Sequence, residues 1–258
     1  MLRPPKNSAA RKNFIIAFVV LLVVGAAYLY MTRGETAEDR LNANSQSNST
    51  PTNTQTNWDT KPTNESTTKI PSELFLSVPF TPQAPTANWD ELHNEACEEA
   101  SVIMANAYFN GIHSLPPAVV EKQIEQLTKW QQDNLGYYLS INTKEVTEMI
   151  EANYDLNAEI VDISEDTIKK ALSENKLVIV PANGQMLGNP NFKQPGPIYH
   201  MFVITGYDSD NFITNDPGTR NGLNYKYSYS TIRDAAGNWE PGPHEVDLSN
   251  KKIIIVSK

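Results

Sequence analysis

The chain has 258 residues, with 21 Lys and Arg against 30 Asp and Glu, a formal charge of -9, four His and one Cys. An acidic chain repels phosphate backbones, so we expect no nucleic-acid partner. A single Cys excludes an internal disulfide and a cysteine-rich zinc site, and no pair of histidines has the spacing of a metal site. We therefore expect neither a metal nor another cofactor.

The first apolar segment covers residues 14–31, which read FIIAFVVLLVVGAAYLYM without a charge. A helix of this length spans roughly 27 Å at about 1.5 Å per residue, enough to cross a bilayer. The basic tail of residues 1–13 places the N-terminus in the cytoplasm by the positive-inside rule. We predict a single-pass membrane anchor in contact with lipid, with the rest of the chain outside. A cleaved secretory signal ending near residues 24–26 is the alternative, and it also exports the protein.

Residues 32–70 are rich in Asn, Thr and Ser and almost without branched aliphatic side chains. Such a segment buries too little apolar surface to offset its conformational entropy, which predicts a disordered linker. Residues 71–258 form the folded domain, and they carry 13 Lys and Arg against 25 Asp and Glu, a formal charge of -12.

Helical spacing of apolar residues after Cys97, ending at Asn110 and Gly111, predicts that Cys97 begins a helix. Further helices are expected near 117–132, 143–153 and 164–174. Short β-rich segments follow at 159–163, 177–181, 200–207, 211–215 and 252–256, and the third and fourth of these form a hairpin. Helices first and strands afterwards predict an α+β domain in which N-terminal helices pack on an antiparallel sheet.

The single thiol, Cys97, is either a small buried apolar residue or a nucleophile. A sulfur at a helix N-terminus faces unpaired N–H groups and the positive end of the helix dipole, which favour the thiolate. Exported free thiols are a liability unless they are buried or used.

A histidine and a carboxylate are placed to meet across the predicted hairpin. His200 begins one strand and Asp216 follows the other, so the carboxylate can reach the imidazole. Together with Cys97 they supply a nucleophile, a base and an orienting group, as thiol acyl transfer requires. Gln83 carries a side-chain N–H donor that can stabilise an oxyanion beside the backbone N–H of Cys97. The alternatives are a structural histidine for His200, a turn former for Asp216 and an ordinary polar loop residue for Gln83.

Three blocks carry a resemblance to a known family: VPFTPQAP, NWDELHNEACEEASVIMANAYFNG and HMFVITGYDSDNFITNDPGT. Together they resemble the double-glycine leader peptidases that process bacteriocins, family thirty-nine of the cysteine peptidases, and especially their stand-alone relatives. The resemblance covers roughly residues 75 to 257 and implies a papain-like fold. It also implies that Cys97 is the nucleophile, His200 the general base and acid, Asp216 its orienting residue and Gln83 the oxyanion-hole donor.

The chain departs from this family after the Cys, where Glu98 and Glu99 replace the usual Gly-Pro. Carboxylates oppose a thiolate but suit the first turn of a helix, so the sequence leaves the net effect on the pKa of Cys97 open. We expect a membrane-tethered cysteine peptidase acting outside the cytoplasm on a peptide or protein. The alternatives are a weak or inactive domain that binds peptide or cell wall, and a cell-wall peptide amidase.

Overall fold

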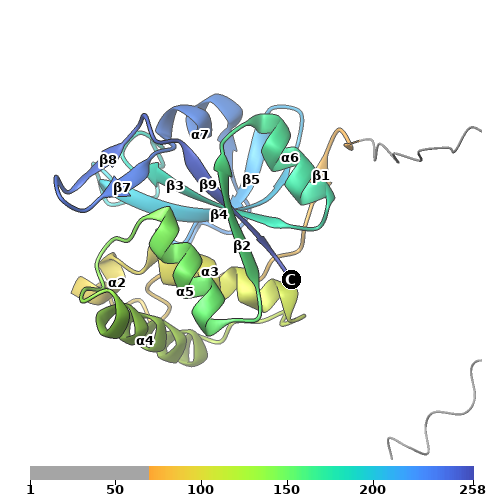
Figure 1. Ribbon diagram of the computed structural model, residues 1–258. Helices are drawn as coiled ribbons and strands as arrows, with labels where there is room; N and C mark the ends of the chain where they lie inside the picture. The colour runs from red at the N-terminus through yellow and green to blue at the C-terminus, as the bar shows by residue number, and fades with distance from the viewer. Residues whose placement is uncertain (1–69) are drawn as a thin grey trace, which may run out of the picture. The chain divides into compact units, whose positions relative to one another are not determined.

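The structure is a computed structural model that describes residues 70–258 (Figure 1). The predicted basic tail, membrane helix and nearly all of the predicted linker fall in residues 1–69, outside the described part. Within residues 70–258, no helix is long and apolar enough to cross a bilayer.

The sheet is antiparallel throughout and has seven strands. Its order is β2-β9-β3-β4-β5-β6, and a short β1 also pairs with β4. The strands are β1 (Leu74–Phe75), β2 (Asn157–Asp162), β3 (Leu177–Asn183), β4 (Tyr199–Tyr207), β5 (Asn211–Asn215), β6 (Tyr225–Ser228) and β9 (Lys252–Ser257). β7 (Asn238–Glu240) and β8 (Glu245–Asp247) form a separate two-stranded ribbon.

Helices cover both faces of the sheet (Figure 1). One face carries α2 (Glu91–Asn94), α3 (Cys97–Phe109), α4 (Pro117–Asn134) and α5 (Thr143–Asn153). The other face carries α6 (Glu165–Ser173) and α7 (Tyr229–Ala235). Central β3 and β4 are buried on both faces, because alternate residues of each strand contribute to the two apolar cores.

Several elements begin where the sequence supplies the matching signal. The Asn142 side chain caps α5 by accepting from the N–H groups of Lys144 and Glu145, and the Glu145 carboxylate accepts from the N–H of Asn142. This capping box satisfies the free N–H groups of the first turn. Ser164 caps α6 in the same way by accepting from Thr167 N–H. The helices predicted near residues 97, 117, 143 and 164 are therefore confirmed, and so is the α+β class.

The predicted β4–β5 hairpin is also confirmed, and its turn depends on one aspartate. The Asp208 carboxylate accepts from the N–H groups of Asp210 and Asn211, which fixes the turn. The sequence did not predict β1, β6, β7, β8 and α7, which are short elements stabilised mainly by tertiary packing.

Candidate active site

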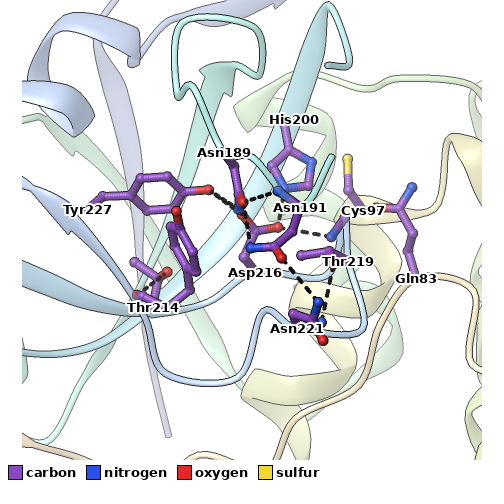
Figure 2. A network of polar contacts seen from close by, with 12 residues as sticks. Gln83, Cys97, Asn189, Asn191, His200, Thr214, Asp216, Thr219, Asn221 and Tyr227 are labelled. Carbon is purple, nitrogen blue, oxygen red and sulfur yellow. Dashed lines mark hydrogen bonds and ion pairs between the residues drawn. The ribbon is translucent and has the colours of Figure 1, made fainter. Parts of the chain in front are cut away.

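The candidate residues lie where a helix and two strands meet. Cys97 begins α3, His200 is the second residue of β4, and Asp216 directly follows β5. The helix α3 packs on β4, and Tyr199, the residue before His200, lies in the electrostatic surroundings of Cys97 and Glu98. Figure 2 draws Cys97, Gln83, His200 and Asp216 in one region.

His200 and Asp216 form a buried pair. The Nε2 atom of His200 lies 2.7 Å from Oδ1 of Asp216, and the two side chains are 1% and 0% exposed. This contact leaves the other ring nitrogen, Nδ1, available for a different partner. The sheet register explains the pairing. Val203 of β4 lies opposite Asn215, the last residue of antiparallel β5, so the next residue, Asp216, lies closer to the start of β4, where His200 is.

Three further donors hold the Asp216 carboxylate (Figure 2). Tyr227 Oη and Asn189 Nδ2 donate to Oδ2 at 2.5 and 3.2 Å, and the Gly218 N–H donates to Oδ1 at 2.9 Å. Burial alone would raise the pKa of Asp216, but His200 and these hydrogen bonds outweigh it and hold the pKa below its ordinary value. The carboxylate is therefore charged and fixed beside the imidazole.

Close packing holds the imidazole as well. A Cβ at Gly218 would stand 2.8 Å from Cε1 of His200, so a glycine is required there. Phe192 meets the ring edge-on at a centroid distance of 5.1 Å. The orientation of His200 thus depends on loop residues from both sides of β4.

Cys97 is buried among carboxylates. It is 4% exposed, and its Sγ–H donates to Oε2 of Glu98 at 3.0 Å. Burial, followed by the charges of Glu98, Glu99 and Glu95, raises the pKa of Cys97 well above its ordinary value. Burial, together with the neighbouring carboxylates, therefore outweighs the helix N-terminus and favours the thiol over the thiolate.

Glu98 and Glu99 are themselves buried, at 1% and 2% exposure. Burial raises the pKa of Glu98 to about 7, despite hydrogen bonds from Cys97 and the Ile141 N–H. Burial and the charge of Glu98 raise the pKa of Glu99 well above its ordinary value, although Gln131 donates a hydrogen bond to it. Both glutamates therefore keep their protons to a higher pH than an exposed glutamate does.

The two buried glutamates make stability fall as pH rises. The pKa of each glutamate in the folded state lies above its unfolded value near 4.5, so at intermediate pH the folded protein binds more protons than the unfolded protein does. The stability that this binding contributes is fully present below about pH 4.5 and decreases as the pH rises, through about 7 in the case of Glu98. For Glu98 alone the loss is roughly 3 kcal/mol.

We expect urea unfolding of the wild type to show a lower free energy of unfolding at pH 8 than at pH 5. Glu99→Gln should flatten this dependence, whereas Glu148→Gln on the exposed face of α5 should not; equal stability at both pH values would contradict the burial argument.

Gln83 lies beside the same strand end, but its side chain is engaged. Its backbone N–H donates to the Pro217 carbonyl at 2.9 Å, next to Asp216. Its Nε2 donates to the carbonyls of His93 and Asn94 at 2.9 and 3.0 Å, and its buried Oε1 has no partner. Service as an oxyanion donor would require this amide to turn away from the carbonyls. The first N–H of α3, that of Cys97, has no carbonyl within the helix to bond.

The site is closed in this structure. A surface depression of about 400 Å³ is lined by residues including Val78, Phe80, His113 and Leu223, and by none of the four candidate residues. Cys97 and His200 are only 4% and 1% exposed, so little of either side chain is open to solvent.

Sequence reasoning missed three participants: Asn189, Tyr227 and the part that Glu98 plays at the sulfur. Asn189 comes from the long β3–β4 loop and Tyr227 from β6, and neither stands at a motif spacing from Asp216. Glu98 is adjacent to Cys97 in the sequence, but only the direction of its side chain shows that it accepts a hydrogen bond from the thiol. Within residues 70–258 no group of three metal-ligating side chains is assembled.

The chain combines an α+β fold with a Cys at a helix N-terminus and a buried His–Asp pair, the residue types that hydrolases of the cysteine peptidase type use. The model of the Peptidase_C39 like family matches residues 75–242. The chain belongs to this family.

One solved structure, described as a crystal structure of a candidate C39-like peptidase from Bacillus anthracis, is similar to this chain at 15% sequence identity and a TM-score of 0.48. The similarity covers 72% of this chain and 98% of that one. No curated protein gives a significant match.

Proposed function

We propose that the protein is a cysteine peptidase or amide hydrolase in which Cys97 is the nucleophile, His200 the base and acid, and Asp216 the residue that positions His200. The observation that carries the proposal is the buried 2.7 Å contact between His200 and Asp216, at the start of β4, on which α3 packs with Cys97 at its N-terminus. The ring nitrogen that Asp216 does not contact, Nδ1, is free to exchange protons with substrate and water.

The mechanism proposed is acyl transfer through a thioester. The S–H bond of Cys97 breaks and its proton passes to a neighbouring base as the sulfur bonds to the carbonyl carbon of an amide. The C–N bond then breaks as the amine takes a proton from His200, and a water molecule that gives a proton to His200 hydrolyses the acyl-enzyme. Asp216 keeps Nε2 of His200 hydrogen-bonded, so that Nδ1 faces the reaction. The N–H of Cys97, with Gln83 after rotation of its amide, stabilises the oxyanion.

An electrophilic peptide tests this proposal without knowledge of the natural sequence. We expect a peptidyl vinyl sulfone to add one mass equivalent to the folded protein at Cys97, because the site supplies both the nucleophile and the means to activate it. His200→Ala should slow the addition by about a hundredfold or more. Mass spectrometry of tryptic peptides measures the adduct. Addition at the same rate to His200→Ala, or only to urea-unfolded protein, would refute it.

The second candidate function is a domain that binds peptide or cell-wall material without hydrolysing it. The raised pKa of Cys97 favours it, since a neutral buried thiol is a poor nucleophile. The adduct experiment separates the two, because a binding domain leaves the vinyl sulfone unreacted.

The substrate and location belong to the same proposal. The formal charge of -12 on residues 71–258 favours a positively charged peptide or protein. Cell-wall peptides are the alternative substrate, and parallel digestion of a peptide library and of purified peptidoglycan distinguishes the two.

We further propose that residues 14–31 anchor the enzyme in the membrane, with residues 71–258 outside. Cell fractionation with and without protease treatment of intact cells tests this.

A further inference from the structure

The partner of the Cys97 thiol is a carboxylate with a fixed direction. Oε2 of Glu98 accepts the Sγ–H at 3.0 Å, and Oε1 of the same carboxylate accepts the Ile141 N–H at 2.9 Å. With Glu98 at 1% exposure, no water competes for these contacts. The oxygen that faces the sulfur is therefore held in place by a backbone donor on the opposite side of the carboxylate.

The same backbone segment links this carboxylate to the strand that carries the imidazole. Tyr199, the residue before His200, donates its hydroxyl to the Ile141 carbonyl at 3.0 Å. Ile141 thus bonds Glu98 through its N–H and Tyr199 through its C=O. One connected set of buried hydrogen bonds therefore links Glu98, which contacts the sulfur, to the strand that carries His200.

The electrostatic surroundings of Glu98 are mainly acidic. The side chains that act on it come from its own segment and from β4. They belong to Glu95, Cys97, Glu99 and Tyr199. None of these four side chains can carry a positive charge. A proton moving onto Glu98 therefore relieves repulsion among the neighbouring carboxylates.

We propose that Glu98 accepts the thiol proton of Cys97 in the first step of hydrolysis, which leaves His200 to protonate the departing amine. This role deepens the proposed function and rests on it. Glu98 touches the reacting sulfur and is in this sense a catalytic residue, while Asp216 remains a positioning residue.

The proton balance closes over one turnover. The cycle begins with Glu98 as carboxylate, Cys97 as thiol and His200 as imidazolium. The S–H bond breaks, its proton goes to Glu98 and the sulfur bonds to the carbonyl carbon. The C–N bond then breaks as His200 gives its proton to the amine. Water next bonds to the acyl carbon and gives a proton to His200; the C–S bond breaks, and the thiolate recovers its proton from Glu98.

The transfer also removes the main obstacle to a thiolate at this position. After burial, the largest cause of the raised pKa of Cys97 is the charge of Glu98, followed by its hydrogen bond. Both disappear when Glu98 carries the proton. The pKa of about 7 for Glu98 is close to neutral pH, where a base is most effective.

Alkylation of Cys97 by iodoacetamide at different pH values tests the role of Glu98 directly. In the wild type we expect the rate to rise through a midpoint near pH 7, as Glu98 ionises, and then to level off. In Glu98→Gln this step should vanish, and the rate at pH 7 should fall by about a hundredfold, in the range of general-base effects. Glu99→Gln is the matched control, because Glu99 is equally buried beside the thiol but bonds Gln131 instead of Sγ.

The opposite sign would overturn the proposal. If Glu98 only repels the thiolate, Glu98→Gln lowers the pKa of Cys97 and alkylation becomes faster. An unchanged midpoint near pH 7 would overturn it as well. Near-UV circular dichroism verifies the fold of each variant, and should Glu98→Gln be unfolded, Glu98→Asp retains a carboxyl and is expected to keep the step with a lower rate. Alkylation needs no substrate, so its result is separate from peptide turnover dependent on Cys97, which decides the hydrolase function.

Discussion

A Cys97→Ala variant is expected to lose peptide hydrolysis to the level of the uncatalysed reaction. The sulfur is the only thiol of the chain, and the acyl-enzyme requires it. The side chains that surround the sulfur are carboxylates. To act as nucleophiles they would have to form a mixed anhydride from an unactivated amide carbonyl, so none of them can replace the thiol. Release of new amino termini from a peptide library, measured with a fluorogenic amine reagent, checks this result. Turnover by Cys97→Ala equal to that of the wild type would remove the hydrolase from consideration.

Ser101→Ala provides the control for this experiment. Ser101 lies one turn further along α3, is 0% exposed, and its Oγ has no hydrogen-bond partner. Removing that hydroxyl alters the same buried helix face without touching the sulfur, and it relieves an unsatisfied polar group. We expect unchanged turnover and equal or higher stability, so a loss confined to Cys97→Ala reports on chemistry.

The sequence predicted the parts of the site that depend on local pattern. A helix beginning at Cys97 follows from the periodicity of its apolar residues, and the approach of Asp216 to His200 follows from two strands joined by a tight turn. An antiparallel hairpin brings the start of one strand beside the end of the other whatever the rest of the fold does. The contact between these two residues was therefore predictable to within a residue of register.

The remainder depends on side-chain directions that no local pattern encodes. Tyr227 reaches Asp216 only because β6 pairs with β5, and the sequence did not predict β6. The sign of the shift in the pKa of Cys97 depends on how deeply Glu98 and Glu99 are buried, and charged residues beside a helix start are ordinarily exposed. Burial of both carboxylates under α4 and the segment around Ile141 is a tertiary result.

Asp216→Asn is expected to lower kcat by about 10² to 10⁴-fold with a smaller effect on KM, because the amide neither fixes the imidazole as firmly nor stabilises its charged form. Asp210→Asn, in the exposed β4–β5 turn, should leave kcat unchanged. Turnover of Asp216→Asn equal to that of the wild type would show that His200 needs no partner. A positioning role further predicts that the pH profile of kcat shifts in the variant, which a purely structural loss would not cause.

Stability provides the second measurement on Asp216→Asn. The amide places a donor where Asn189 or Tyr227 now donates, so the variant should lose about 1 to 3 kcal/mol at neutral pH. The pKa of Asp216 is lowered in the folded state, so its contribution is present above the unfolded value near 3.8 and is lost as the pH falls through the folded value. Urea unfolding should therefore show a gap between wild type and variant at neutral pH that narrows as the pH falls below about 3.8. A gap that stays constant with pH would mean that Asp216 is not held as a charged carboxylate. His200 would then lack the negative partner that stabilises its protonated form.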